Sequence, residues 1–221
     1  MNILEFSDRF DAIVVLKADL PEKRFFEKFQ GIPVFAADGA ALKLDAIGVI
    51  PDKIVGDMDS LREGNFDNKF QDHKLVYDPD QNSNDFEKTL KYCELNELNK
   101  ILVVGIHGGE YEHSINNWSV FTKFSRKLEL VIYDERRYGI SIFDDTRIET
   151  SENEIISIIP NGRAELSTKN LRWELINEYL TLGEREGARN RALENHIEIF
   201  VHFGSILLFI DARLPYAPKK K

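Results

Sequence analysis

The chain has 221 residues, of which 43% are hydrophobic and 30% are charged, so it can bury a core as ordinary globular proteins do. Its 29 basic and 38 acidic residues give a net charge of −9, which argues against non-specific nucleic-acid binding. No apolar run approaches the ~18 residues of a membrane-spanning helix. The single cysteine, Cys93, excludes an intrachain disulfide and fits a reducing compartment. From these two observations we expect a cytoplasmic protein with no membrane partner.

The first part of the sequence alternates between predicted strands and helices. Apolar runs near residues 11–18, 32–37, 52–56, 73–77, 100–104 and 128–134 predict strands. Helices are expected at 21–31, where Pro21 opens and Gly31 closes the segment, at 40–48, from Asn84 to about 98, and at 110–124. Strands that are short, continuous apolar runs indicate a Rossmann-like, mostly parallel sheet with helices on both faces.

The pattern changes near residue 140. Short alternating runs such as 154–160, 196–203 and 205–213 follow, separated by turns, and they are typical of antiparallel strands. We therefore predict an α/β domain over residues 1–138 and a C-terminal antiparallel β-sandwich domain over residues 139–221.

Acidic and glycine residues follow the predicted strands of the α/β domain. Asp38 and Gly39 follow the second strand, Asp57 and Asp59 the third, Gln81, Asn84 and Asp85 the fourth, and Gly108, Gly109, Glu112 and His113 the fifth. Ligands bind beyond the carboxyl ends of strands in such sheets. Clustered carboxylates favour a hard cation, Mg²⁺, and glycine loops let backbone N–H groups approach phosphates. The combination predicts phosphoryl chemistry on a nucleotide.

Each of these features alone has a simpler explanation. An Asp-rich turn is common on protein surfaces, Asn84 or Asp85 could only cap a helix, and a lone histidine is more often structural than catalytic. The prediction depends on four such features that share one sheet edge. The sequence contains neither a Walker-type nor a G-x-G-x-x-G motif, which argues against common P-loop and dinucleotide sites.

Four ordered segments resemble the thiamine pyrophosphokinase family. They are "AADGA" with "PDKIVGDMDS", then "DQNSND", then "GIHGGEYEHSINN", and finally "SIIP", "NLRW", "GARNRA" and "GSILLFI" near the end. The family shows A-D-G-[GA]-A with P-D-x-[IL]-[IV]-G-D-x-D-S at the first position. The resemblance covers nearly the whole chain, and the segment from Pro51 to Ser60 is its most specific part.

The resemblance implies transfer of a pyrophosphoryl group from ATP to the hydroxyl of thiamine, which gives thiamine diphosphate and AMP. It implies a homodimer with the thiamine site at the subunit interface. It places Mg²⁺ at Asp57 and Asp59 with Asp38 and Asp85 nearby, and phosphates at Gln81 and the loop around Asp85. It also places Glu112, His113, Trp173 and Asn190 at or near the thiamine site.

Within this expectation we take Asp57, Asp59 and Asp85 as catalytic and metal-binding residues, with Asp85 as the candidate general base. Asp38, Gly39, Gln81, Asn84, Gly108 and Gly109 are the expected nucleotide site. Trp173 could stack on the cationic thiazolium ring, or it could belong to the core.

The chain departs from the family pattern where substrate would bind. Glu110 stands where many members have arginine, and Arg189 stands where serine is usual. Another cation would have to replace that arginine, and Lys17, Arg189 and Arg191 are the candidates. These departures leave two alternatives open: a related pyrophosphokinase that acts on another hydroxymethyl substrate such as a pterin, or a non-catalytic sensor of thiamine or nucleotide.

Overall fold

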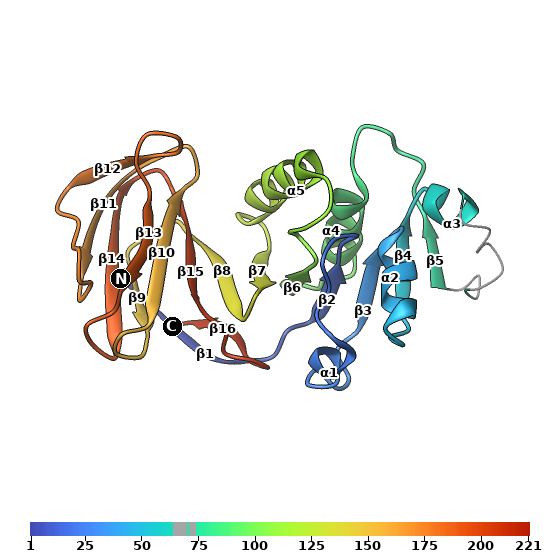
Figure 1. The fold of residues 1–221 in the computed structure, drawn as a ribbon, viewed down its shortest axis with the longest axis horizontal. Coiled ribbons are helices and arrows are strands. Elements are labelled where there is room, and N and C mark those ends of the chain that lie inside the picture. Colours follow the sequence, from blue (N-terminus) through green and yellow to red (C-terminus); the bar gives the residue numbers. More distant parts are fainter. Residues whose placement is uncertain (64–69, 71–73) are drawn as a thin grey trace. The chain divides into compact units, whose positions relative to one another are not determined.

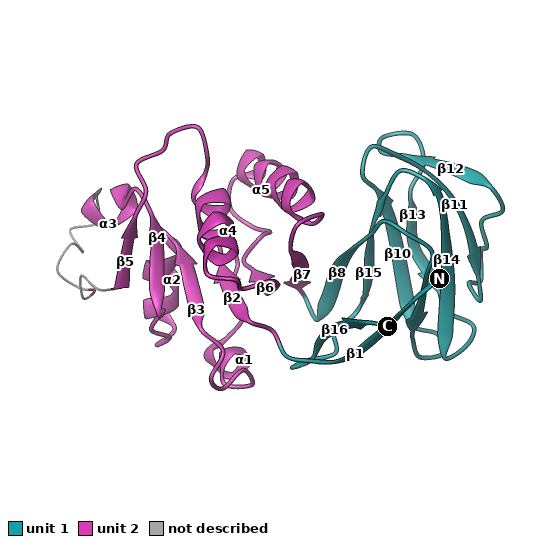
Figure 2. Ribbon diagram, turned by 180° about the vertical axis from the view of Figure 1, so that it is seen from behind, with its two compact units in different colours: residues 1–9, 135–221 teal, residues 10–134 magenta. Residues whose placement is uncertain are grey.

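The computed structural model describes residues 1–63, 70 and 74–221 and shows a mixed α/β fold with two large sheets (Figure 1). The chain forms two compact units: unit 1 contains residues 1–9 and 135–221, and unit 2 contains residues 10–134 (Figure 2). The sequence predicts that residues 1–9 belong to the first domain and that this domain ends at residue 138. The structure differs because the first strand pairs with strands of unit 1.

Unit 2 is built on parallel strand pairs. Its strands are β2 (Ala12–Val15), β3 (Val34–Ala37), β4 (Lys53–Gly56), β5 (Leu75–Tyr77), β6 (Lys100–Val104) and β7 (Glu129–Asp134). They lie in the order β7-β6-β2-β3-β4-β5, and each neighbouring pair is parallel. Strands β2 and β3 are buried along their whole length, as expected for continuous apolar runs covered on both sides. The expected strand at 73–77 begins at His73, which lies outside the described residues.

The helices of unit 2 are α1 (Lys23–Phe26), α2 (Ala40–Ala46), α3 (Asp59–Glu63), α4 (Asp85–Leu95) and α5 (Tyr111–Phe124). Helix α4 packs on β2, β3 and β4 through a face that includes Phe86 and Leu90. Helix α1 is shorter than the sequence predicts, because Phe25 and Phe26 anchor a single turn whose N-cap, Glu22, makes no side-chain capping bond.

The parallel arrangement brings the loops after β3, β4 and β5 to one edge of the sheet. Asp38 follows β3, Asp57 follows β4 and Asp78 follows β5. Backbone bonds tie these loop starts together, since Asp38 N donates to Val55 O at 2.9 Å and Asp78 N donates to Gly56 O at 2.9 Å. The residues that sequence analysis singled out after these strands therefore begin at one edge.

Unit 1 consists of strands. Strands β1 (Asn2–Asp8), β9 (Thr146–Glu149), β11 (Arg163–Lys169), β12 (Glu178–Thr181), β14 (His196–Phe203) and β16 (Ala217–Lys220) form a sheet in the order β12-β11-β14-β9-β1-β16. Strands β8 (Arg137–Ile142), β10 (Ile155–Pro160), β13 (Gly187–Arg191) and β15 (Ile206–Asp211) pair in the order β13-β10-β15-β8. Burial alternates strictly along β10, as predicted for an antiparallel strand covered on one face.

Strand β1 lies between β9 and β16 in its sheet. It is parallel to β9 and antiparallel to β16, and Leu4 on it is fully buried.

Across the part of the chain that the structure describes, we find no helix with the length and apolar character that a membrane span requires.

Candidate active site

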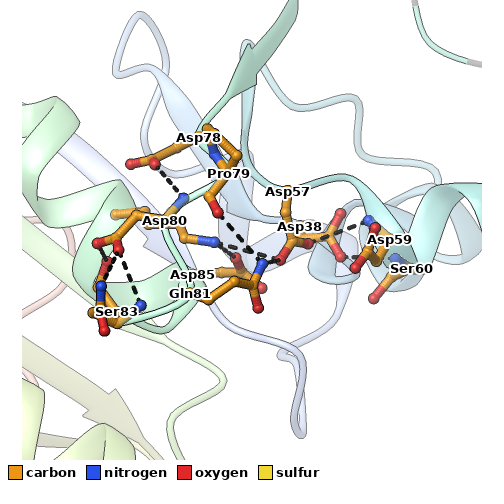
Figure 3. Close-up of polar contacts among 12 residues, drawn as sticks. Asp38, Asp57, Asp59, Ser60, Asp78, Pro79, Asp80, Gln81, Ser83 and Asp85 are labelled. Atoms are coloured by element: carbon orange, nitrogen blue, oxygen red, sulfur yellow. Dashed lines mark hydrogen bonds and ion pairs between the residues drawn. The ribbon is translucent and has the colours of Figure 1, made fainter.

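Three carboxylates meet at the carboxyl edge of the unit 2 sheet. Asp38 follows β3, Asp57 follows β4, and Asp85 is the first residue of α4. One oxygen from each lies within 4.8 Å of the others (Figure 3). Asp38 is only 2% exposed, whereas Asp57 and Asp85 are half-buried. We call these three residues the acidic cluster. Like charges this close repel each other strongly unless a positive charge lies against them.

A buried lysine supplies part of that positive charge. The Nζ of Lys88 lies 3.3 Å from Asp85 Oδ1 and 3.5 Å from Asp57 Oδ2, and its side chain is 2% exposed. Burial alone would lower the pKa of Lys88, but the adjacent carboxylates outweigh it and raise that pKa. Lys88 is therefore held as a cation beside two of the three acids.

The three-acid environment affects Asp57 and Asp85 in opposite directions. Burial raises the pKa of Asp85, and the charges of Asp38 and Asp57 add to this against the opposing charge of Lys88. Burial also acts to raise the pKa of Asp57, but hydrogen bonds from Gln81 and from the Asp59 N–H, together with Lys88, lower it. Without metal, Asp85 is therefore the stronger base of the two carboxylates.

The backbone around the acidic cluster adopts conformations that side chains rarely favour. Asp38 has φ = 32° and Met58 has φ = 63°, so the turns after β3 and β4 are strained. Gly56 has φ = 157°, and a Cβ placed there would lie 2.8 Å from Asp38 Cβ and 2.9 Å from Asp85 Oδ1. The glycine before Asp57 therefore lets the carboxylates approach the end of β4.

One oxygen of Asp38 is left for a ligand. Its Oδ2 accepts a hydrogen bond from Ser60 N at 3.1 Å, but the buried Oδ1 has no partner among the described residues. An unpaired buried carboxylate oxygen is costly. Three carboxylates, one of them with such an oxygen, are a donor set that fits Mg²⁺. This ion prefers oxygen ligands, and it usually takes only a few from the protein and the rest from water or phosphate.

The loop between β5 and α4 is fixed by its own side chains (Figure 3). Asp80 accepts hydrogen bonds from Ser83 Oγ at 2.6 Å and from Asn82 N at 3.0 Å. These bonds, that of Ser83 first, lower the pKa of Asp80 to about 2. Gln81 then donates from its amide Nε2 to Asp57 Oδ2 at 3.1 Å. The loop thereby orients one carboxylate of the acidic cluster.

A cavity of about 520 Å³ opens beside the acidic cluster in unit 2. Its lining comes from the loops after β2, β3 and β6 and from the starts of α3, α4 and α5, and it includes Lys17, Gly39, Lys43, Ser60, Asn84, Asp85, Gly108, Gly109, Glu110, His113 and Asn117. The volume is within the ordinary range for a small-molecule site of about 300–1,000 Å³. Of the expected nucleotide residues, Gly39, Asn84, Gly108 and Gly109 line this cavity.

Two lysines also line the cavity. Lys17 Nζ lies 3.4 Å from Ser60 Oγ, and a Cβ on Gly39 would lie 2.7 Å from the Lys17 stem. Lys43 instead donates to Ala18 O at 2.7 Å. Gly39 therefore leaves room for the Lys17 side chain to cross the cavity wall.

Asp59 lies outside the acidic cluster, although sequence analysis paired it with Asp57. Its side chain is exposed and forms an ion pair with Arg62 at 3.5 Å. Asp38 is expected from the sequence to bind nucleotide, and the structure groups it with Asp57 and Asp85. Lys88 is not among the residues expected from the sequence, although its i, i+3 spacing from Asp85 on a predicted helix is a usable signal.

The residues expected near thiamine belong to both units. In unit 2, Glu112 and His113 are exposed in the first turn of α5, and His113 Nε2 lies 3.0 Å from Glu110 Oε2. In unit 1, Trp173 is 59% exposed and so is not a core residue. Asn190 is buried and bonds the backbone of Trp173 through both its amide atoms, with Nδ2 to Trp173 O at 2.6 Å and Trp173 N to Oδ1 at 3.1 Å.

Glu110 stands where many family members have arginine, and three cations are the expected candidates for its replacement. Of these three, Lys17 lines the cavity. Arg189 and Arg191 lie on β13 of unit 1. Arg189 is exposed with φ = 60°, and its N–H donates to Ser157 Oγ at 3.0 Å. Arg191 Nη1 donates to Asn153 O at 2.8 Å.

Comparison with known proteins gives the acidic cluster and the cavity a context. Residues 31–133 match the family model described as the thiamin pyrophosphokinase catalytic domain. A thiamine pyrophosphokinase 1 of Oryza sativa subsp. japonica is 30% identical over 171 residues, which is 67% of this chain and 62% of the relative. The chain is similar to thiamine pyrophosphokinases.

Other thiamine pyrophosphokinases extend the comparison. Thiamine pyrophosphokinase 1 of Arabidopsis thaliana is 28% identical over 163 residues, 67% of this chain, and the chain covers 61% of that relative's length. The crystal structure of yeast thiamin pyrophosphokinase has a TM-score of 0.77 at 18% identity, covering 93% of this chain and 87% of the other. The crystal structure of thiamine pyrophosphokinase from Bacillus subtilis has a TM-score of 0.75 at 19% identity, covering 92% of this chain and 100% of the other. The resemblance predicted from the motifs and the mixed α/β fold are both confirmed.

The matched region contains most of the site. Asp38, Asp57, Asp85 and Lys88 all fall within residues 31–133, as do Gly108 and Gly109. Lys17 lies before the matched region, so the family model says nothing of it. The thiamine pyrophosphokinase match therefore covers the acidic cluster and only part of the cavity wall.

Proposed function

We propose that the chain is a thiamine pyrophosphokinase that transfers a pyrophosphoryl group from ATP to the hydroxyl of thiamine. The observation that carries the proposal is the acidic cluster beside the glycine-lined cavity, within the region that matches the catalytic domain. The hydroxyl oxygen of thiamine would attack the β-phosphorus of ATP, the bond from that phosphorus to the bridging α–β oxygen would break, and AMP would leave.

Asp38, Asp57 and Asp85 would hold Mg²⁺, and Asp59, named with Asp57 in the sequence prediction, remains a candidate from its exposed position. When bound, the ion would neutralise phosphate charge and hold the phosphates in line with the attacking oxygen. Gln81 would keep Asp57 oriented, because its amide donates to Asp57 Oδ2. Asp85 would also accept the hydroxyl proton, since its carboxylate lies in the acidic cluster beside the cavity.

The remaining cavity wall would bind the nucleotide. Backbone N–H groups at Gly39, Gly108 and Gly109 and the side chain of Asn84 would contact ATP, with Gln81 and Asp38 at the phosphate end. Lys17 would supply the positive charge that Glu110 does not, since its ammonium lies at the cavity wall near Ser60. A cationic contact to phosphate of this kind is a strong, charge-assisted hydrogen bond.

The finer architecture and the assembly are proposals as well. We infer that residues 10–134 form a Rossmann-like ATP-binding domain, and that residues 1–9 and 135–221 form a β-sandwich. A homodimer with thiamine at the subunit interface would involve Glu112, His113, Trp173, Arg189 and Asn190. The exposed aromatic ring of Trp173 supports a role outside the core, where it could stack on a thiazolium. The free, buried thiol of Cys93 fits a reducing, cytoplasmic location.

The test is a coupled product assay with purified protein, ATP, Mg²⁺ and thiamine that quantifies AMP and thiamine diphosphate together. Equal amounts of both products are expected. In the Asp57→Asn variant, turnover should fall by about 100-fold or more, because a preorganised charge in the site is lost. Circular dichroism should show an unchanged fold. A pterin alcohol in place of thiamine is the specificity control.

Binding of ATP without formation of either product would contradict the proposed reaction. It would favour the alternative of a non-catalytic sensor of thiamine or nucleotide. Products from the pterin alcohol alone would contradict the substrate. Full activity in Asp57→Asn would contradict the proposed metal site while leaving the reaction intact.

A further inference from the structure

Lys88 is buried against the acidic cluster, and the proposed reaction gives it no step. Lysine is seldom buried unless its charge is paired, and here both partners are proposed metal ligands. We propose that Lys88 is a positioning residue, a resident counter-ion that holds Asp57 and Asp85 in place without metal and weakens the binding of free divalent cation. The cation then binds tightly only together with nucleotide phosphates. This inference rests on the proposed function, because it takes the acidic cluster as the metal site.

The charge count supports this role. Three carboxylates contribute −3 and the Lys88 ammonium +1, so the acidic cluster carries −2, the charge that one divalent cation neutralises. Without Lys88 the acidic cluster would carry −3 with its oxygens within 4.8 Å of one another. Repulsion at such separations in a partly buried site is large. Lys88 therefore stabilises the protein when no metal is bound.

The contacts show why the lysine should compete with a cation. Lys88 Nζ lies against Asp85 Oδ1 and Asp57 Oδ2, so it contacts two of the three carboxylates that a metal would use. Asp38 Oδ1, buried and without a partner among the described residues, is left for the ligand. A free divalent ion thus finds a buried unpaired oxygen on Asp38, while one oxygen on each of the other two carboxylates is shared with an ammonium. Phosphate oxygens brought by a nucleotide would supply the missing ligands.

Helix α4 keeps Lys88 in this position. Asp85 and Lys88 lie three residues apart on one face of the helix, so the pair forms within a single turn. Lys91, one turn further, lies 3.2 Å from Glu87 Oε1 and 3.9 Å from Asp80 Oδ2, outside the acidic cluster. Lys91 is a matched control, because it shares the helix and the ion-pairing but not the proposed metal ligands.

The experiment measures Mn²⁺ binding by electron paramagnetic resonance, in the absence of nucleotide, for the full chain and its Lys88→Met, Lys88→Arg and Lys91→Met variants. Lys88→Met should bind Mn²⁺ at least about tenfold more tightly than the wild type, since the cluster gains one net negative charge. Lys88→Arg and Lys91→Met should bind as the wild type does. Damage to the fold would weaken binding, so a gain in affinity reports the charge itself.

Thermal melts without metal keep the inference testable if Lys88→Met is poorly folded. The melting temperature of Lys88→Met should fall, and either Mn²⁺ or the second substitution Asp85→Asn should restore it, because both remove the excess negative charge. Failure of both to restore it would overturn the inference.

Two outcomes separate this inference from the proposed function. If the wild type makes AMP and thiamine diphosphate but folded Lys88→Met binds Mn²⁺ no more tightly, the inference alone is overturned. If the wild type makes neither product and binds Mn²⁺ neither alone nor with an ATP analogue, the proposed function is overturned, and the inference with it.

Discussion

At the scale of single residues, the site depends on positions where a side chain and a strained backbone coincide. Asp38 and Met58 have positive φ angles, and Gly56 makes room that any Cβ would fill. The sequence predicted that Asp38, Asp57 and Asp85 would share a sheet edge, because each follows a strand. It could not predict which carboxylate oxygens meet or that Lys88 lies against them, since both depend on turn geometry and helix rotation.

Lys17 offers a test of the phosphate contact. Replacement of Lys17 by Met should raise the KM for ATP by about tenfold, since the loss of one charge-assisted hydrogen bond costs at least about 1.4 kcal/mol. The change in kcat should be smaller. Steady-state kinetics with varied ATP measures both constants. Lys17→Arg keeps the positive charge and should have the KM of the wild type. Lys23→Met, at an exposed lysine outside the cavity lining, should also leave the KM unchanged. An unchanged KM in Lys17→Met would show that the cation lies elsewhere.

Ser83 offers a test that depends on pH. Its hydroxyl donates to Asp80, whose folded pKa is about 2 against 3.8 for the free group. A lowered folded pKa means stability that is present above pH 3.8 and is lost as the pH falls toward about 2. Ser83→Ala should therefore reduce the free energy of unfolding at neutral pH, and the difference should shrink as the pH falls through this range.

Urea unfolding at a series of pH values measures this difference for Ser83→Ala. Carboxyl ¹³C NMR of Asp80 should show its pKa rising in the variant. A difference in unfolding free energy that does not change with pH would mean that Ser83 acts by packing alone.

At the scale of secondary-structure elements, helix α4 joins the loop after β5 to the acidic cluster. Its N-cap, Asn84, accepts a hydrogen bond from Glu87 N at 2.9 Å through its side chain, and this leaves Asp85 at the first helical position, facing Asp57. The sequence predicted the start of this helix near Asn84, because the polar loop and the apolar periodicity agree, and it left open whether Asn84 or Asp85 is the cap. For α1 the same reasoning predicted too long a helix, because Pro21 and Gly31 mark the loop ends and not the single turn between them.

The cap of α4 gives the prediction at this scale. Asn84→Ala should lower the free energy of unfolding by about 1 kcal/mol, because the N–H of Glu87 loses its acceptor. Asn84→Ser keeps an acceptor and should retain most of the stability. Chemical denaturation followed by circular dichroism measures the change. An Ala variant as stable as the Ser variant would contradict the cap.

At the scale of the whole molecule, the sequence predicted two domains of different class but not the connection between them. Periodicity identifies strands, whereas the partner of a strand depends on contacts distant in sequence. Residues 1–9 read as the start of the α/β domain because a strand and helix follow them. They belong to unit 1, because β1 pairs with β9 and β16.

Leu4 tests this assignment. It is fully buried on β1, and Leu4→Ala should destabilise unit 1 by about 2–5 kcal/mol through loss of apolar contacts and the cavity left behind. Hydrogen–deuterium exchange should rise in residues 1–9 and 135–221. It should change little in residues 10–134. A uniform rise over both units would show that they unfold as one cooperative body.

The position of β1 also has a consequence for synthesis on the ribosome. β1 is made before residues 10–134, yet one of its two neighbours, β16, spans Ala217–Lys220 and is made after them. The intervening residues 10–134 have a hydrophobic core of their own and can fold while translation continues. Strand β1 must wait, without this partner, until β16 leaves the ribosome. The nascent chain therefore carries an unpaired, aggregation-prone strand while residues 10–134 and the strands of unit 1 are synthesised, which makes slow translation or scarce chaperones a hazard for this protein.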